Sequence, residues 1–117
     1  AECLAAAEAK VAEMGLCAPV AGHVGDGNFH HLILIDPDNT NEVEAAQEYI
    51  GWLNDLAISM EGTCTGEHGV GQGKTAYLER EFGDAVDFMR RIKSRLDPDG
   101  LFNPGKMFRA PGGKNGF

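Results

Sequence analysis

The chain has 117 residues with a formal net charge of −8, and 43% of its residues are hydrophobic. So acidic a chain lacks the basic surface that nucleic acids and anionic membranes require, and we expect neither as a partner. No apolar run approaches the roughly 20 residues of a transmembrane helix. The composition therefore predicts a small globular unit without a transmembrane segment.

The sequence begins with Ala1 inside a helix-like run. Since 117 residues are few for an enzyme that also encloses a large cofactor, we expect a piece of a longer protein that is inactive by itself. The three cysteines show no CxxC spacing, which predicts neither a disulfide framework nor a thiolate zinc site. Free thiols are the expectation, and they favour an intracellular compartment.

Residues 2–14 place apolar side chains at helical spacing, and Gly15 then ends the pattern. A second helix is predicted after Asn39, because Asn39 and Glu42 have the spacing of a capping box. Its expected buried seam consists of Val43, Ala46, Ile50, Leu53, Ala57 and Met60. Trp52 lies off this seam, and we expect it at an edge or against another part of a longer protein.

The stretch from Gly22 to Leu34 predicts a β-hairpin. Asp26-Gly27 is a strong signal for a type I′ turn, because both central residues must adopt positive φ. With that turn His23 faces His30 across the two strands, roughly 5 Å apart at Cβ. Two imidazoles so placed can bind one metal ion.

The two strands are expected at about residues 18–24 and 29–35. Val24 and Phe29 then lie on the face opposite the paired histidines, where they can enter the core. His31 also points to that opposite face, and we interpret it as structural. The continuous apolar run at residues 32–34 predicts a strand that is covered on both faces.

The stretch from Gly62 to Lys74 contains five glycines, too many for a regular element. It predicts either a flexible connector or a loop whose backbone approaches a ligand closely, and it does not match the phosphate-binding loop. An acid and an imidazole, Glu67 and His68, are adjacent within it. His23, His30 and Glu67 make a set of two histidines and one carboxylate that suits zinc, iron or manganese.

After this loop we expect a short helix over residues 75–81 and a longer helix that Asp84 caps. The expected buried stripe of the longer helix consists of Val86, Met89, Ile92 and Leu96. Its basic C-terminal end suits the helix dipole and needs no nucleic acid. Residues 97–100 predict a turn, and residues 110–117 a tail.

Three ordered motifs stand at residues 22–30 (GHVGDGNFH), 61–74 (EGTCTGEHGVGQGK) and 96–108 (LDPDGLFNPGKMF). Together they resemble the C-terminal part of the FAD-linked oxidases, flavoproteins of the vanillyl-alcohol-oxidase type. The resemblance implies an α+β fold, with an antiparallel sheet and helices packed on one side. Residues 1–109 would then form the C-terminal portion of the substrate (cap) domain.

The resemblance implies that His23, His30 and Glu67 hold a divalent metal ion, with zinc favoured, and that His68 is the catalytic base. In the implied reaction a small D-2-hydroxy acid becomes the 2-oxo acid. The base takes the hydroxyl proton, and hydride passes from C2 to FAD, which a domain outside this sequence mainly binds.

Asn103 and Lys106 match a family motif close to the active site, and we expect them near the cofactor. Leu32 stands where relatives that act on hydroxyglutarate carry a polar Asn, which disfavours a second carboxylate in the substrate. The resemblance favours D-lactate as the substrate and glycolate second.

The implied electron acceptor is a cytochrome, a quinone or another carrier. The implied location is the cytoplasm or the periphery of the inner membrane, mitochondrial in a eukaryote, and the oligomeric state stays open. A different interpretation of the same hairpin site is a stand-alone metal-binding or regulatory module without catalysis. A flavin domain encoded upstream in the same gene would favour the enzyme.

Overall fold

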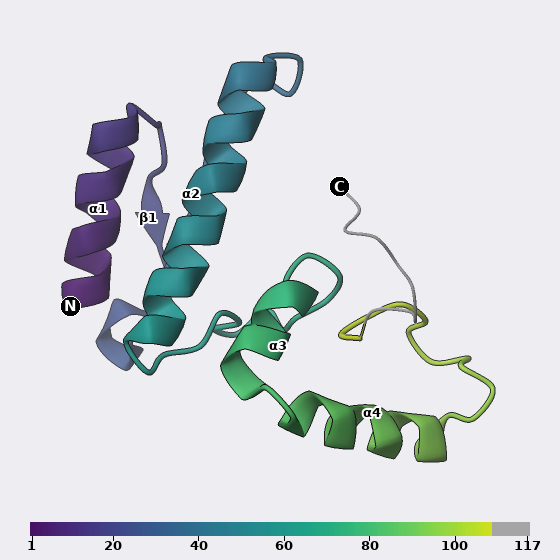
Figure 1. Cartoon of the computed structure of the whole chain (residues 1–117). Helices are drawn as coiled ribbons and strands as arrows, with labels where there is room; N and C mark the ends of the chain where they lie inside the picture. Colours follow the sequence, from purple (N-terminus) through teal and green to yellow (C-terminus); the bar gives the residue numbers. More distant parts are fainter. Residues whose placement is uncertain (109–117) are drawn as a thin grey trace. The chain divides into compact units, whose positions relative to one another are not determined.

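The structure is a computed structural model that describes residues 1–108, and Figure 1 shows its elements. The elements are α1 (Glu2–Met14), β1 (Val20–Ala21), the 3₁₀-helix η1 (Val24–Asp26), β2 (His30–His31), α2 (Thr40–Ser59), α3 (Thr75–Phe82) and α4 (Ala85–Leu96). The predicted α+β class is confirmed. None of the described helices has the length and apolar character needed to cross a membrane. The predicted boundary at 109 and the predicted tail lie outside the described residues.

The chain divides into two compact units, residues 1–67 and the part from His68 onward. In the first unit α1 follows the prediction. Its apolar stripe is buried or half-buried, with Ala7 fully buried. Gly15 ends the helix at φ 65°, a left-handed conformation that glycine adopts without steric cost.

The N-terminal end of α2 is held by side chains, largely as predicted. Asn39 accepts a hydrogen bond from the Asn41 amide, and Glu42 accepts one from the Asn39 side chain. The other carboxylate oxygen of Glu42 accepts from the Asp36 amide at 2.8 Å rather than from the Asn39 amide of a standard capping box. The cap therefore also fixes the turn that precedes the helix.

The buried stripe of α2 differs from the predicted seam. Ile50 and Met60 are more than two-fifths exposed, whereas Tyr49 is fully buried. The predicted seam follows a spacing of about 3.5 residues, whereas a straight helix repeats every 3.6 residues, so the seam moves gradually around the helix. The large ring of Tyr49 occupies the position that faces α1 and β2. Trp52 is half-buried beside Tyr49, with ring centroids 6.0 Å apart, at the edge of this stripe as expected.

The hairpin also differs from the prediction. β1 and β2 are antiparallel, but Ala21 pairs with His30, so the predicted pairing of His23 with His30 is wrong by two residues. Instead of a type I′ turn, the connection contains η1, and the His23 carbonyl accepts from the Asp26 and Asn28 amides. A two-residue turn would need an extended chain up to Gly25, but glycine weakens strands and Gly22 leaves the extended region at φ 131°.

The shift by two residues has a limited effect on which face each side chain occupies. Because side chains alternate along a strand, His30 stays on the predicted face and His31 on the opposite one. The strands are shorter than expected, although an isolated bridge between Cys17 and Leu34 extends the pairing. In the described structure Leu34 is 61% exposed and Val24 47%, so the expected covering of the apolar run and the expected core position of Val24 are wrong.

The second unit contains α3 and α4, whose contact is centred on Val70, Leu78 and Val86, with Phe108 packed against them. The predicted short helix is confirmed. Asp84 precedes α4 without making a side-chain cap, because its backbone is already helical at φ −62° and ψ −19°. In the described structure Ile92 and Leu96 are exposed, so the predicted buried stripe of α4 is limited to its first half.

The predicted turn after α4 is organised by one carboxylate. The buried Asp97 side chain accepts from the Leu101 amide at 2.8 Å and the Phe102 amide at 3.0 Å, and it pairs with Lys93. The Lys93 ammonium also donates to the Phe102 carbonyl at 2.7 Å. The hydrogen bond from Lys93 lowers the pKa of Asp97, and the two backbone amides add to this effect against the opposing effect of burial.

We predict that Asp97 titrates below its usual pKa of 3.8 in the folded chain. A carboxyl whose pKa is lower when folded stabilises the fold above the unfolded pKa, and this stabilisation is lost as the pH falls through the folded pKa. The Leu101 and Phe102 amide resonances report the protonation of Asp97 in an NMR titration. Asp97→Asn should abolish this response and Asp99→Asn should not, whereas a midpoint at or above 3.8 in the unaltered chain would contradict the assignment.

Candidate metal centre

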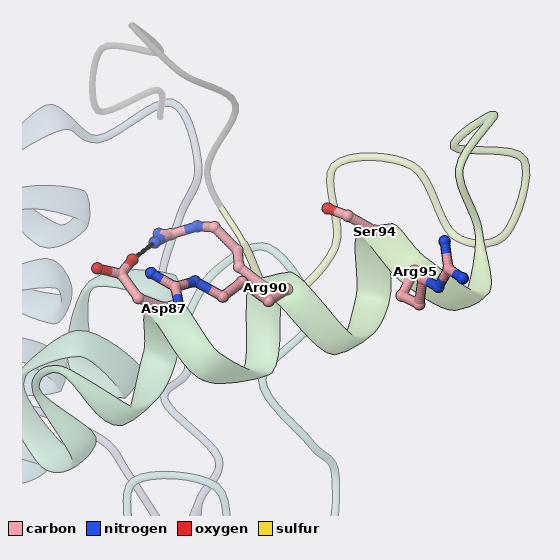
Figure 2. Close-up of a pocket in the computed structure, with 5 residues that line it drawn as sticks. Asp87, Arg90, Ser94 and Arg95 are labelled. Carbon is pink, nitrogen blue, oxygen red and sulfur yellow. Dashed lines mark hydrogen bonds and ion pairs between the residues drawn. The ribbon is translucent and has the colours of Figure 1, made fainter.

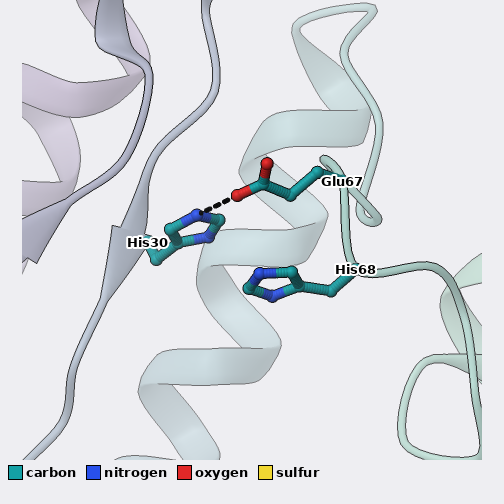
Figure 3. A group of neighbouring side chains, drawn as sticks. All are labelled: His30, Glu67 and His68. Carbon is teal, nitrogen blue, oxygen red and sulfur yellow. Dashed lines mark hydrogen bonds and ion pairs between the residues drawn. The ribbon is translucent and has the colours of Figure 1, made fainter.

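His30 and Glu67, two of the predicted site residues, are in direct contact. His30 Nε2 lies 2.8 Å from Glu67 Oε1, within hydrogen-bonding distance, although the two residues are 37 positions apart in sequence. Figure 3 shows the imidazole and the carboxylate pointing toward one another. β2 supplies the histidine, and the glycine-rich segment after α2 supplies the carboxylate. The contact therefore joins two of the three sequence motifs within the first unit.

His23 approaches the same carboxylate from the connection between the strands. Its Nε2 lies 3.9 Å from Glu67 Oε2, the oxygen that does not contact His30. The His23 side chain is 69% exposed, against 25% for His30. Both predicted histidine ligands therefore lie near Glu67, with His23 placed by a 3₁₀ connection rather than by cross-strand pairing. His23 does not belong to the group of candidate ligands whose atoms all lie within 4.8 Å of one another.

The chemistry of this donor set fits a divalent cation. Imidazole nitrogen and carboxylate oxygen suit zinc, iron and manganese, and three protein ligands leave a coordination position for a substrate oxygen. His30, Glu67 and His68 form a group of candidate ligands, with His68 directly following Glu67 in the chain. His68 is the first residue of the second unit. No cysteine belongs to this group.

His31 lies on the other face of β2, as predicted, and is held there by α1 and α2. Its side chain is 1% exposed, and its Nδ1 shares a 3.0 Å hydrogen bond with the hydroxyl of Tyr49. Its Nε2 lies 3.7 Å from Glu8, too far for a hydrogen bond. Both helices therefore cover this face of the sheet, which leaves His30 on the other face.

Burial determines the charge states of His31 and Tyr49. Burial lowers the pKa of His31, and the nearby Glu8 carboxylate only partly opposes this. Burial, together with the charge of Glu8, also raises the pKa of Tyr49 to about 12. A neutral imidazole and a neutral phenol therefore share the hydrogen bond. The expectation that His31 is structural agrees with its burial, but no spacing signal pointed to Tyr49 as its partner.

We predict that Tyr49→Phe destabilises the first unit by about 1–3 kcal/mol, because it leaves a buried ring nitrogen without a partner while keeping the packing. Urea unfolding followed by the fluorescence of Trp52 measures this unit, since Trp52 is the only tryptophan and lies beside Tyr49. Glu48→Gln, at an exposed position of the same helix, is the control and should change the stability by less than about 0.5 kcal/mol. Equal stabilities of the two variants would show that the His31 bond contributes nothing.

A hollow of about 550 Å³ in the second unit is a separate feature of the structure. It lies along the polar side of α4, where Asp87, Arg90, Ser94 and Arg95 line it (Figure 2). Arg90 is neutralised by Asp87 at 2.6 Å and Glu79 at 3.0 Å. The hollow is lined by no histidine and no cysteine, and no base lies in it to activate Ser94, so we assign it no part in the chemistry.

Asn103 and Lys106, which were expected near the cofactor, occupy the turn region that follows α4. Both are exposed, and the Lys106 amide donates to the Asn103 carbonyl at 3.2 Å. Asn103 adopts a positive φ of 47°, which asparagine tolerates better than most residues. Their conformation belongs to a tight turn, and their role stays a prediction.

Comparison with known proteins identifies the family. The sequence model of the family described as FAD linked oxidases, C-terminal domain, matches residues 1–107. The chain belongs to this family. The resemblance stated from the three motifs is thereby confirmed, and the candidate metal centre lies within the matched region.

This FAD-linked oxidase domain is similar in sequence to part of several dehydrogenases and oxidases. The chain is 50% identical over 93 residues to the mitochondrial D-lactate dehydrogenase (cytochrome) of Arabidopsis thaliana, covering 79% of this chain and 16% of the relative. It is 46% identical over 91 residues to the corresponding D-lactate dehydrogenase (cytochrome) 1 of Saccharomyces cerevisiae, covering 77% and 15%. It is 42% identical over 88 residues to the glycolate oxidase subunit GlcD of Bacillus subtilis, covering 74% and 19%.

These relatives are oxidoreductases, and the chain spans less than a fifth of the length of each. The FAD-linked oxidase family implies FAD as the cofactor of the whole protein.

Proposed function

We propose that this chain forms the metal- and substrate-binding part of an FAD-dependent dehydrogenase that oxidises a D-2-hydroxy acid, with D-lactate favoured, to the 2-oxo acid. The observation that carries the proposal is the 2.8 Å contact between His30 and Glu67, with His23 directed at the second oxygen of the same carboxylate. The names of the D-lactate dehydrogenase relatives support the choice of reaction.

In this proposal His23, His30 and Glu67 hold a divalent ion, with zinc favoured. When bound, such an ion supplies a Lewis acid for the carboxylate and hydroxyl oxygens of a 2-hydroxy acid. The exposure of His23 and Glu67 leaves the ligand atoms open to a small molecule. The direct contact holds the His30 and Glu67 ligand atoms 2.8 Å apart, and the proton that they share would leave when a metal ion binds.

His68 is the proposed general base. Its imidazole, in the neutral form, accepts the proton of the C2 hydroxyl through a ring nitrogen as the C2–H bond breaks. When bound, FAD, the cofactor that the family implies, would supply the two-electron oxidant that takes the hydride from C2. Peptide linkage to Glu67 keeps this imidazole near the carboxylate ligand, and the glycines on either side of the pair let the loop backbone approach a small substrate.

The substrate side chain is proposed to be small and apolar. Leu32 follows His30 by two residues, so it projects from the same face of the strand, and it is 55% exposed. An apolar side chain there favours the methyl group of D-lactate over a second carboxylate. Glycolate is the alternative substrate, supported by the likeness to the glycolate oxidase subunit.

In this proposal the electron acceptor and the cellular location are taken from the names of the relatives. A cytochrome acceptor and a mitochondrial location stand in the names of the Arabidopsis and yeast proteins, and we propose both for a eukaryotic parent of this chain. A quinone or another carrier is the corresponding proposal for a bacterial parent. Asn103 and Lys106 are proposed to lie near the cofactor.

The experiment compares Glu67→Gln with His68→Ala in the flavin-loaded enzyme. A ligand holds the metal in the ground state, whereas a base acts only as the proton moves. Glu67→Gln should lower the metal content, and added zinc should partly restore the rate. His68→Ala should keep the metal and bind substrate, yet reduce flavin roughly 10²- to 10⁴-fold more slowly in anaerobic stopped flow.

The control is Glu44→Gln, which removes an exposed carboxylate of α2 and should change neither metal content nor rate. Flavin reduction by D-lactate at the normal rate in His68→Ala would remove His68 from the mechanism. Loss of metal in that variant would instead make His68 a ligand.

A further inference from the structure

Two glycines lie where they would collide with the segment that carries His30 if they had side chains. A Cβ built on Gly66 would lie 2.6 Å from the Asn28 side-chain oxygen. A Cβ built on Gly22 would lie 2.9 Å from both the Asn28 carbonyl oxygen and the Phe29 Cα, and 3.3 Å from the His30 ring. Each distance is shorter than a van der Waals contact allows. The close packing of residues 28–30 therefore depends on the missing side chains.

The contact between Asn28 and Gly66 joins the two parts that carry the His30–Glu67 pair. Asn28 precedes His30 by two residues, and Gly66 directly precedes Glu67. Asn28 Oδ1 thus rests against the backbone one residue before the carboxylate. Gly66 adopts φ 51°, so the loop turns at this point and presents Glu67 to the imidazole. Both residues belong to the first unit.

We propose that Asn28 is a positioning residue for the metal centre, and that Gly66 lacks a side chain so that Asn28 can set the position of Glu67 relative to His30. A type I′ turn at Asp26-Gly27, with Asn28 directly after it, does not explain this contact, because the connection contains η1 instead. The inference rests on the proposed metal role of His30 and Glu67.

The glycine loop supplies a matched control. Gly71 has φ 54°, nearly the value of Gly66, but a Cβ built on it would meet no atom within 4 Å. Alanine at either position therefore costs the same backbone strain, roughly 1–2 kcal/mol for a left-handed residue. Only alanine at Gly66 would also displace Asn28. The difference between the two variants isolates the contact from the strain.

The experiment is a double-mutant cycle on zinc affinity, measured by isothermal titration with zinc chloride on the 117-residue chain. Gly66→Ala should weaken zinc binding about tenfold or more relative to Gly71→Ala, the usual range for residues that orient metal ligands. In the Asn28→Ala background the effect of Gly66→Ala should fall to that of Gly71→Ala, since the clash is gone. Far-UV circular dichroism checks that each variant is folded.

A second readout needs no metal. In the metal-free chain, ¹⁵N-resolved spectra of the His30 ring report its hydrogen bond to Glu67. Gly66→Ala and Asn28→Ala should each change the Nε2 shift, and Gly71→Ala should not. Adding Gly66→Ala to Asn28→Ala should change the shift no further, since the two residues act through one contact. If the chain binds no zinc, the proposed metal role fails, but this readout still decides whether Asn28 positions the pair. Equal effects of Gly66→Ala and Gly71→Ala, or an Nε2 shift left unchanged by Asn28→Ala, would overturn the inference.

Discussion

The hydrogen bond between His30 and Glu67 is the interaction on which the candidate site depends. It joins a two-residue strand to a glycine-rich segment that has no regular structure of its own. Neither part could hold a metal ligand precisely by itself. The buried His31 on the other face fixes the direction in which His30 points, and the close approach of Asn28 to Gly66 fixes where Glu67 lies. Packing around His31 thus positions His30, and packing of Asn28 against Gly66 positions Glu67.

Much of the helical structure was predictable because its signals are local. Gly15, Asn39 and the spacing of apolar residues determine where the first two long helices begin and end, and these effects act within a few residues. The buried stripe of α2 was predicted less well. Which of several neighbouring apolar residues is covered depends on partners distant in sequence, and here Tyr49 is selected by contact with His31.

His30 and Glu67 are in contact and His23 lies near the same carboxylate, but the backbone reaches this arrangement by a different path from the predicted hairpin. The Asp26-Gly27 pair favours a tight turn only if the flanking residues can extend, and Gly22 and Gly25 do not favour extension. The resulting error of two residues preserved the face of each side chain. A one-residue error would have sent His30 into the contact with the helices. The Asn28–Gly66 approach carried no sequence signal, because it depends on the folded path of both segments.

The central claim is that two imidazoles and one carboxylate from this chain bind a divalent ion. X-ray absorption spectroscopy of the zinc-loaded chain tests it most directly, because the fine structure distinguishes nitrogen and oxygen from sulfur ligands. The account predicts a first shell of nitrogen and oxygen at about 2.0–2.2 Å with imidazole multiple scattering, and a weaker imidazole contribution in His30→Ala, which keeps His23. A shell containing sulfur at about 2.3 Å, or a spectrum unchanged by His30→Ala, would contradict it.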